Sequence, residues 1–246
     1  MHTPVEVTER ALENIGGADG LVSLGGGSAI GLGKALALRM GVPHIAIPTT
    51  YSGSEISPIL GQTREGKKTT IRDKRVVPQA VIYDVALTLS LPLDVTASSG
   101  FNAMAHAFEA LYALDRSPET DRIAVDAIEG FARALPTLVT TPKDEEARAA
   151  VLYAAYLSGR VLAARTMGLH HKLAHVLGGL YDLPHAPCMR RCFRMSSGST
   201  KLPRGNSSRR QPGHSAMTVR PKGWRYSQPN SARQDTLLPW ACRATG

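Results

Sequence analysis

The first 92 residues alternate between short apolar runs and segments with helical periodicity. Apolar side chains at three- and four-residue spacing predict a helix over residues 5–17. Residues 21–24 then predict a short buried strand, residues 29–40 a second helix, and residues 44–48 a second buried strand. This order of strand, glycine turn, helix and strand predicts a βαβ unit, in which the two strands run parallel.

The pattern becomes purely helical near residue 93. Before that point the charged segment 62–75 predicts a hairpin or a loop, and residues 80–84 predict a third strand. Beyond it, the apolar spacing predicts helices near 95–114, 118–134, 143–165 and 168–180. Asp94 or Thr96 is expected to cap the first of these helices, and Ser117 the second.

Three regions follow from this pattern and from the distribution of charge. We expect an α/β domain over residues 1–92 and an all-helical domain over residues 93–185, with a cleft between them. Through residue 185 the chain has 17 Lys and Arg against 19 Asp and Glu, whereas the rest has 12 against one. Residues 186–246 therefore carry a net charge of +11 and the first 185 residues −2, which together give the overall +9. Few apolar residues and charge of one sign predict that this basic tail is disordered.

Composition narrows the classes of function. We find neither an apolar run long enough to span a membrane nor an opening signal peptide, so we expect a cytoplasmic protein without a membrane partner. All three cysteines lie in the basic tail, which leaves the first 185 residues without a disulfide or a thiolate nucleophile. The tail's arginines are scattered and have no interleaved aromatic residues, so nucleic acid is not the expected partner.

A glycine turn at residues 25–28 lies between the first predicted strand and the helix that follows it. Glycines at this place let backbone N–H groups approach a pyrophosphate at the N-terminus of the helix. The turn does not match the usual dinucleotide fingerprint, because Ile30 occupies the place of the third glycine. The alternative is an ordinary turn, with Gly31 and Gly33 allowing close packing. The next strand ends at the hydroxyl-rich loop 49–55, where parallel sheets bind ligands.

Histidines and an asparagine at helical spacing form the candidate catalytic cluster. Asn102 and His106 are four residues apart, as are His171 and His175, and His185 follows. Imidazoles in one cleft either bind a metal ion or bind substrate carboxylates and transfer protons near neutral pH. A metal site of this type needs a carboxylate, and position 102 is an amide. Glu109, one turn beyond His106, is either that missing carboxylate or a surface charge.

These motifs together resemble the iron-containing alcohol dehydrogenase superfamily, and most closely its maleylacetate reductase branch. The resemblance covers residues 2–185 and includes the glycine turn, the segments 47–55 and 101–106, and the histidine segment 169–175 with residues 184–185. It implies an α/β dinucleotide-binding domain over residues 1–92 and a helical catalytic domain over residues 93–185.

The resemblance also assigns roles to individual residues. It implies that Gly26, Gly27 and Ser28 hold the pyrophosphate of NADH or NADPH. Thr49, Thr50 and Ser52 are implied to line the nicotinamide side of the cofactor.

For the catalytic cluster, the resemblance places His106, His171 and His185 at metal-ligand positions of the metal-dependent members. His175 corresponds to a histidine near the nicotinamide. Asn102 stands where those members have an aspartate ligand, so we do not expect a metal.

The implied reaction is hydride transfer to the carbon–carbon double bond of maleylacetate, a small dicarboxylate, which gives 3-oxoadipate in the catabolism of aromatic compounds. The proton donor is either His171 or His175, and the family implies a homodimer. A metal-dependent alcohol dehydrogenase of the same superfamily is one alternative. A non-enzymatic fragment with a nucleic-acid-binding tail is another.

The chain also departs from the family pattern at both ends. Family members begin with further strands before the predicted helix 5–17, and they continue into apolar helices after His185. The basic tail resembles none of these helices, as a shifted reading frame would produce. We therefore expect a chain that is truncated at both ends, and whether it is active in this form is left open.

Overall fold

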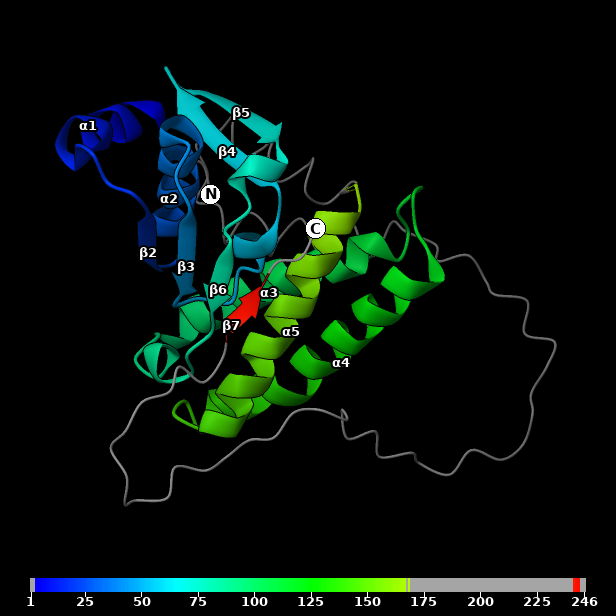
Figure 1. The fold of residues 1–246 in the computed structure, drawn as a ribbon. Helices are drawn as coiled ribbons and strands as arrows, with labels where there is room; N and C mark the ends of the chain where they lie inside the picture. The colour runs from blue at the N-terminus through cyan, green and yellow to red at the C-terminus, as the bar shows by residue number, and fades with distance from the viewer. Residues whose placement is uncertain (1–2, 167, 169–240, 244–246) are drawn as a thin grey trace, which may run out of the picture.

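The structure is a computed structural model that describes residues 3–166, 168 and 241–243. Within these residues an α/β part precedes three long helices, as the sequence predicts (Figure 1). The predicted fourth helix, near 168–180, lies outside the described residues except for Gly168. Most of the basic tail also lies outside them, and there its disorder stays a prediction. Its described residues, 241–243, form a strand, so the prediction of disorder is wrong for these three.

The main sheet carries the predicted βαβ unit. Strand β2 (Leu21–Gly25), helix α2 (Gly27–Met40) and strand β3 (His44–Pro48) follow one another, and the two strands pair in parallel from Leu21 opposite His44 to Gly25 opposite Pro48. Strand β6 (Ala80–Ile82) pairs in parallel with β3, and β7 (Ala241–Arg243) pairs antiparallel with β6. The strand order is β2-β3-β6-β7, so β2 is one edge of this sheet.

A second, three-stranded sheet lies beside α2. Strands β4 (Ile59–Arg64) and β5 (Lys67–Arg72) form the predicted hairpin, and the short strand β1 (Thr3–Pro4) pairs in parallel with β4. Helix α1 (Val5–Ile15) follows β1 directly. The 3₁₀ turns of this part are η1 (Ser54–Ile56), η2 (Lys74–Val76) and η3 (Ala86–Thr88).

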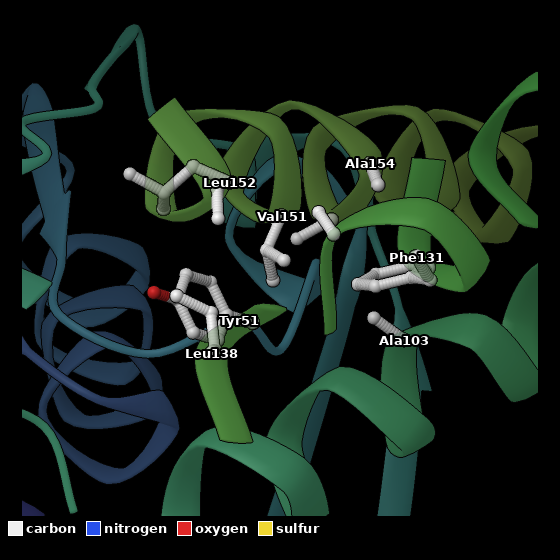
Figure 2. Packing of buried hydrophobic residues seen from close by; sticks show 10 residues of the cluster. Tyr51, Ala103, Phe131, Leu138, Val151, Leu152 and Ala154 are labelled. Carbon is white, nitrogen blue, oxygen red and sulfur yellow. The ribbon is translucent and has the colours of Figure 1, made fainter. Parts of the chain in front are cut away.

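Three helices form the second part: α3 (Leu93–Ala110), α4 (Pro118–Thr140) and α5 (Glu145–Ala164). Small side chains allow them to pack closely. Figure 2 shows one core cluster, in which Phe131 and Val151 are fully buried beside Ala103 and Ala154. Tyr51 belongs to this cluster, although it comes from the loop that follows β3. The two parts of the chain are therefore packed together through that loop.

Two details of the predicted elements are wrong. Strand β2 is not fully buried, because Val22 and Leu24 are 66% and 57% exposed on the face away from α2. Neither Asp94 nor Thr96 caps α3, whose N-cap is Pro92 without a side-chain hydrogen bond. The predicted cap of α4 is confirmed, since the Ser117 hydroxyl accepts from the backbone N–H of Thr120 in a capping box.

No helix in the described part of the chain is long and apolar enough to cross a membrane.

Candidate active site

The glycine turn lies at the carboxyl edge of the main sheet, where β2 ends and α2 begins. Gly25 has a φ of 144°, a backbone conformation that favours glycine. Its carbonyl accepts a hydrogen bond of 3.0 Å from the N–H of Thr49 at the end of β3. This hydrogen bond links the first residue of the glycine turn, Gly25, to the first residue of the hydroxyl-rich loop, Thr49.

Gly26 and Thr50 face one another across this edge. A Cβ atom at position 26 would lie 3.0 Å from Cγ2 of Thr50, so a larger residue would force the loop to move. Gly26 is the N-cap of α2 and provides no side-chain hydrogen bond to it. The positive end of the helix dipole therefore points into the space between the glycine turn and Thr50, which we call the cradle. A backbone without side chains on one side and a hydroxyl on the other suit a phosphate group.

The loop after β3 connects this cradle to the helical part. The N–H of Tyr51 donates to Oγ of Ser99 on α3 at 3.4 Å, and the Tyr51 ring is buried among the helices. The hydroxyl of Ser52 turns toward Glu55 and donates to Oε2 at 3.3 Å. The loop therefore places Thr50 at the cradle and directs the hydroxyl of Ser52 toward Glu55.

Helix α3 presents a polar stripe made of Ser99, Asn102, His106 and Glu109. These residues are three or four positions apart and so share one face of the helix. His106 is buried, with 4% of its surface exposed. The Oδ1 atom of Asn102 is also buried and has no hydrogen-bond partner among the residues that the structure describes. The stripe begins at the loop after β3, because Ser99 contacts Tyr51 of that loop.

At its other end the stripe contacts Gly168. Glu109 is only 1% exposed, so the interpretation as a surface charge is wrong. Its Oε2 atom accepts from the backbone N–H of Gly168 at 3.2 Å, and Oε1 accepts from the hydroxyl of Tyr112 at 3.2 Å. Glu109 therefore holds Gly168, the residue that precedes the histidine segment in sequence, one helical turn from His106.

The remaining predicted catalytic residues are not tested by the structure. His171, His175 and His185 lie outside the described residues, so their roles stay predictions. In the described part of the chain, no group of three or more metal-binding side chains comes together.

Sequence reasoning missed three buried charged residues around the loop. Lys34, Glu55 and Arg148 are each 2% exposed or less. Arg148 on α5 donates to the hydroxyl of Tyr51, to the hydroxyl of Thr96 and to the carbonyls of Leu91 and Pro142. The sequence offers little indication of this burial, because each residue lies in a helix or turn where a charged side chain normally reaches solvent.

Burial changes the acid–base properties near the loop. It lowers the pKa of Lys34 to about 7, although the nearby carboxylate of Glu55 opposes this change. Burial also raises the pKa of Glu55, against hydrogen bonds from its own backbone, from Tyr83 and from Ser52. His44 lies beneath α2, where burial and the charge of Lys34 lower its pKa to about 4.

Comparison with known proteins identifies the class. The Fe-containing alcohol dehydrogenase C-terminal family model matches residues 96–201, and the iron-containing alcohol dehydrogenase model matches residues 1–85. The chain belongs to the iron-containing alcohol dehydrogenase family, which confirms the resemblance.

Within this family the chain is 57% identical over 188 residues to maleylacetate reductase from Rhizobium sp. strain MTP-10005. That alignment covers 76% of this chain and 54% of the relative, so the chain spans about half the length of the curated relatives it matches. The crystal structure of that protein superposes with a TM-score of 0.73 at 56% identity, and covers 77% of this chain and 55% of its own.

Two further solved structures share the fold. Maleylacetate reductase from Agrobacterium tumefaciens has a TM-score of 0.76 at 51% identity, and the match covers 82% of this chain and 60% of that one. Sulfoacetaldehyde reductase from Bifidobacterium kashiwanohense, solved in complex with NAD⁺, has a TM-score of 0.71. It is 24% identical, with 80% of this chain and 58% of its own covered, and so supports the fold alone.

Proposed function

We propose that this chain carries the cofactor cradle and part of the catalytic cluster of an NAD(P)H-dependent reductase that acts on maleylacetate. The observation that carries the proposal is the contact between Gly26 and Thr50. It joins a glycine turn at a helix N-terminus to a hydroxyl-rich loop at the carboxyl edge of parallel strands, which is where α/β sheets bind nucleotides. The identity to maleylacetate reductases supports the substrate.

In this proposal the backbone of Gly26 and Gly27, with Ser28, holds the cofactor pyrophosphate. Thr49, Thr50 and Ser52 line the nicotinamide side. The absence of a side chain at Gly26 fits this role, because a Cβ atom would occupy the space in front of Thr50. The affinities of the chain for NADH and for NADPH decide which of the two is the cofactor.

Reduction of the carbon–carbon double bond requires a hydride on one carbon and a proton on the other. NAD(P)H, when bound, supplies the hydride. The negative charge that then develops on the substrate is stabilised by the histidine cluster, and His171 or His175 donates the proton. Asn102 and His106 line the α3 side of the substrate pocket and bind a substrate oxygen. Protonated imidazoles also neutralise the carboxylates of a dicarboxylate substrate.

We propose that the reaction proceeds without a metal ion. Position 102 offers a neutral amide oxygen in place of a carboxylate, and neutral amides are weak ligands for iron or zinc. A family homodimer is proposed as the functional assembly. Metal-dependent alcohol oxidation is the alternative, and the amide of Asn102 disfavours it.

The test is a fluorescence titration of the purified chain with NADH and with NADPH. We expect saturable binding that Gly26→Asp weakens at least tenfold, since the new carboxylate enters the cradle and repels phosphate. Gly20→Asp is the matched control, because a Cβ there lies in ordinary van der Waals contact, 3.6 Å from Pro43. A turnover assay with maleylacetate follows, with and without a chelator. A native chain that is folded but binds neither cofactor contradicts the proposal.

A further inference from the structure

The loop 49–58 connects the two parts of the protein and lines the proposed cofactor site. At Gly53 it passes very close to α5: a Cβ at this position would lie 2.8 Å from the carbonyl oxygen of Ala155. Its conformation includes a φ of 72° at Gly53 and the single turn η1. Within the loop, the carbonyl of Ser54 accepts from the N–H and from the hydroxyl of Ser57. Contacts from other elements hold the rest of its shape.

Lys34 reaches into this loop from α2. Its ammonium group donates to three backbone carbonyls, those of Ser54 and Ser57 at 2.7 Å and that of Ile59 at 3.2 Å. An ammonium group has three N–H donors, and here each one has its own acceptor. The neutral amine has only two donors, so the geometry matches the charged form.

Glu55 belongs to this loop, and its side chain points into the protein interior. The side chain is fully buried, and each carboxylate oxygen accepts a hydrogen bond from the side chain of another residue. The hydroxyl of Tyr83, just after β6, donates to Oε1 at 2.8 Å, and the hydroxyl of Ser52 donates to Oε2 at 3.3 Å. One of the proposed cofactor-lining residues is thus oriented by this carboxylate.

We propose that Lys34 and Glu55 are positioning residues that hold the loop 49–58 in its cofactor-binding shape. This inference rests on the proposed function, because it concerns the loop of that same site. Buried charges are costly, and apolar residues of similar size often give equal or greater stability. The three donors of Lys34 and the two acceptors of Glu55 are directional, so they select one conformation of the loop. Apolar contacts are not directional and would not select it.

The experiment uses the full chain and compares Lys34→Met with Lys143→Met, which changes an exposed lysine. Two quantities are measured: the Kd for NADH, and the hydrogen-exchange rates of amides in residues 49–58 and in α4. We expect Lys34→Met to weaken NADH binding at least tenfold and to speed exchange in the loop at least tenfold, while α4 stays protected. Unchanged loop exchange and an unchanged Kd overturn the proposal.

A second variant keeps the proposal testable if Lys34→Met does not fold. Tyr83→Phe removes one donor to Glu55 without creating a cavity, and we expect a threefold to tenfold rise in loop exchange. In Lys34→Ala, added propylammonium is expected to restore loop protection, whereas 1-propanol, with one hydroxyl donor, is not. Equal rescue by both contradicts the role of the ammonium group.

The two readouts separate this inference from the proposed function. If the native chain does not bind NADH, the proposed function fails, yet loop exchange still reports on Lys34. If NADH binds and Lys34→Met leaves both the Kd and the loop unchanged, only the positioning role fails.

Discussion

The α/β part and the helical part of the molecule are packed in different ways. The helices bury one large cluster that includes Phe131, Leu138 and Val151. The α/β part buries only small groups, such as Ile30, Ala46 and Val81. It also buries two charged side chains, Lys34 and Glu55, which are held by specific hydrogen bonds. The comparison indicates that apolar packing in the helices supplies most of the stability, while the α/β part carries the proposed cofactor cradle.

The largest expected effect comes from Phe131→Ala in the helical cluster. The ring is fully buried, so its removal deletes apolar contacts and leaves a cavity. We expect the free energy of unfolding to fall by about 3–5 kcal/mol. Urea unfolding followed by circular dichroism measures it. Leu114→Ala, at a fully exposed position, serves as the control and is expected to change stability by less than about 0.5 kcal/mol. Equal effects of the two substitutions contradict the assignment of stability to this cluster.

A smaller effect is expected from the acid titration of His44 in the α/β part. Its Nε2 atom lies 2.7 Å from Oγ of Ser23 beneath α2, and its folded-state pKa is lowered to about 4 from 6.5. Between these values the unfolded chain binds a proton that the folded chain does not, so stability falls as the pH drops from 6.5 toward 4. We expect a loss of about 2 kcal/mol in this range, less than the full shift implies because water screens part of it.

The measurement compares the native chain with His44→Gln, which cannot take up the proton. Lys34 lies near this histidine, and Glu55 elsewhere in the same part titrates in the opposite sense because its pKa is raised. The difference between the two proteins at each pH therefore isolates His44. If the two curves of stability against pH are parallel from pH 4 to 6.5, the histidine is not buried in its neutral form.

Local periodicity was enough to predict most elements of the fold. The βαβ unit, the hairpin and the helices α3, α4 and α5 follow from apolar spacing and turn residues, and the capping residue Ser117 follows from its position before a proline. Helix α4 continues to Thr140, six residues beyond its predicted end and past Pro136. Ends of elements depend on tertiary packing, which spacing along the chain does not contain.

The candidate site was predictable only where its members are neighbours in sequence. The pairing of Asn102 with His106 follows from helical spacing alone. The burial of Lys34 does not, because its acceptors lie 20 to 25 residues further along the chain. The same holds for Glu109, whose partner Gly168 is 59 residues away. Only the folded chain shows that α3 connects the loop after β3, through Ser99, to Gly168, through Glu109.

The smallest expected effect concerns the exposed face of strand β2, and it sharpens the contrast between the two parts. Val22 is 66% exposed, whereas Val81 on β6 of the same sheet is 1% exposed. A hydroxyl costs about 1–3 kcal/mol where it is buried without a partner and almost nothing in water. We therefore expect Val22→Thr to change the free energy of unfolding by less than about 0.5 kcal/mol and Val81→Thr to lower it by about 1–2 kcal/mol, both measured by urea unfolding. A loss at Val22 as large as that at Val81 requires that this face of β2 is covered in solution. The α/β part would then bury a second apolar layer, and the contrast with the helical part would disappear.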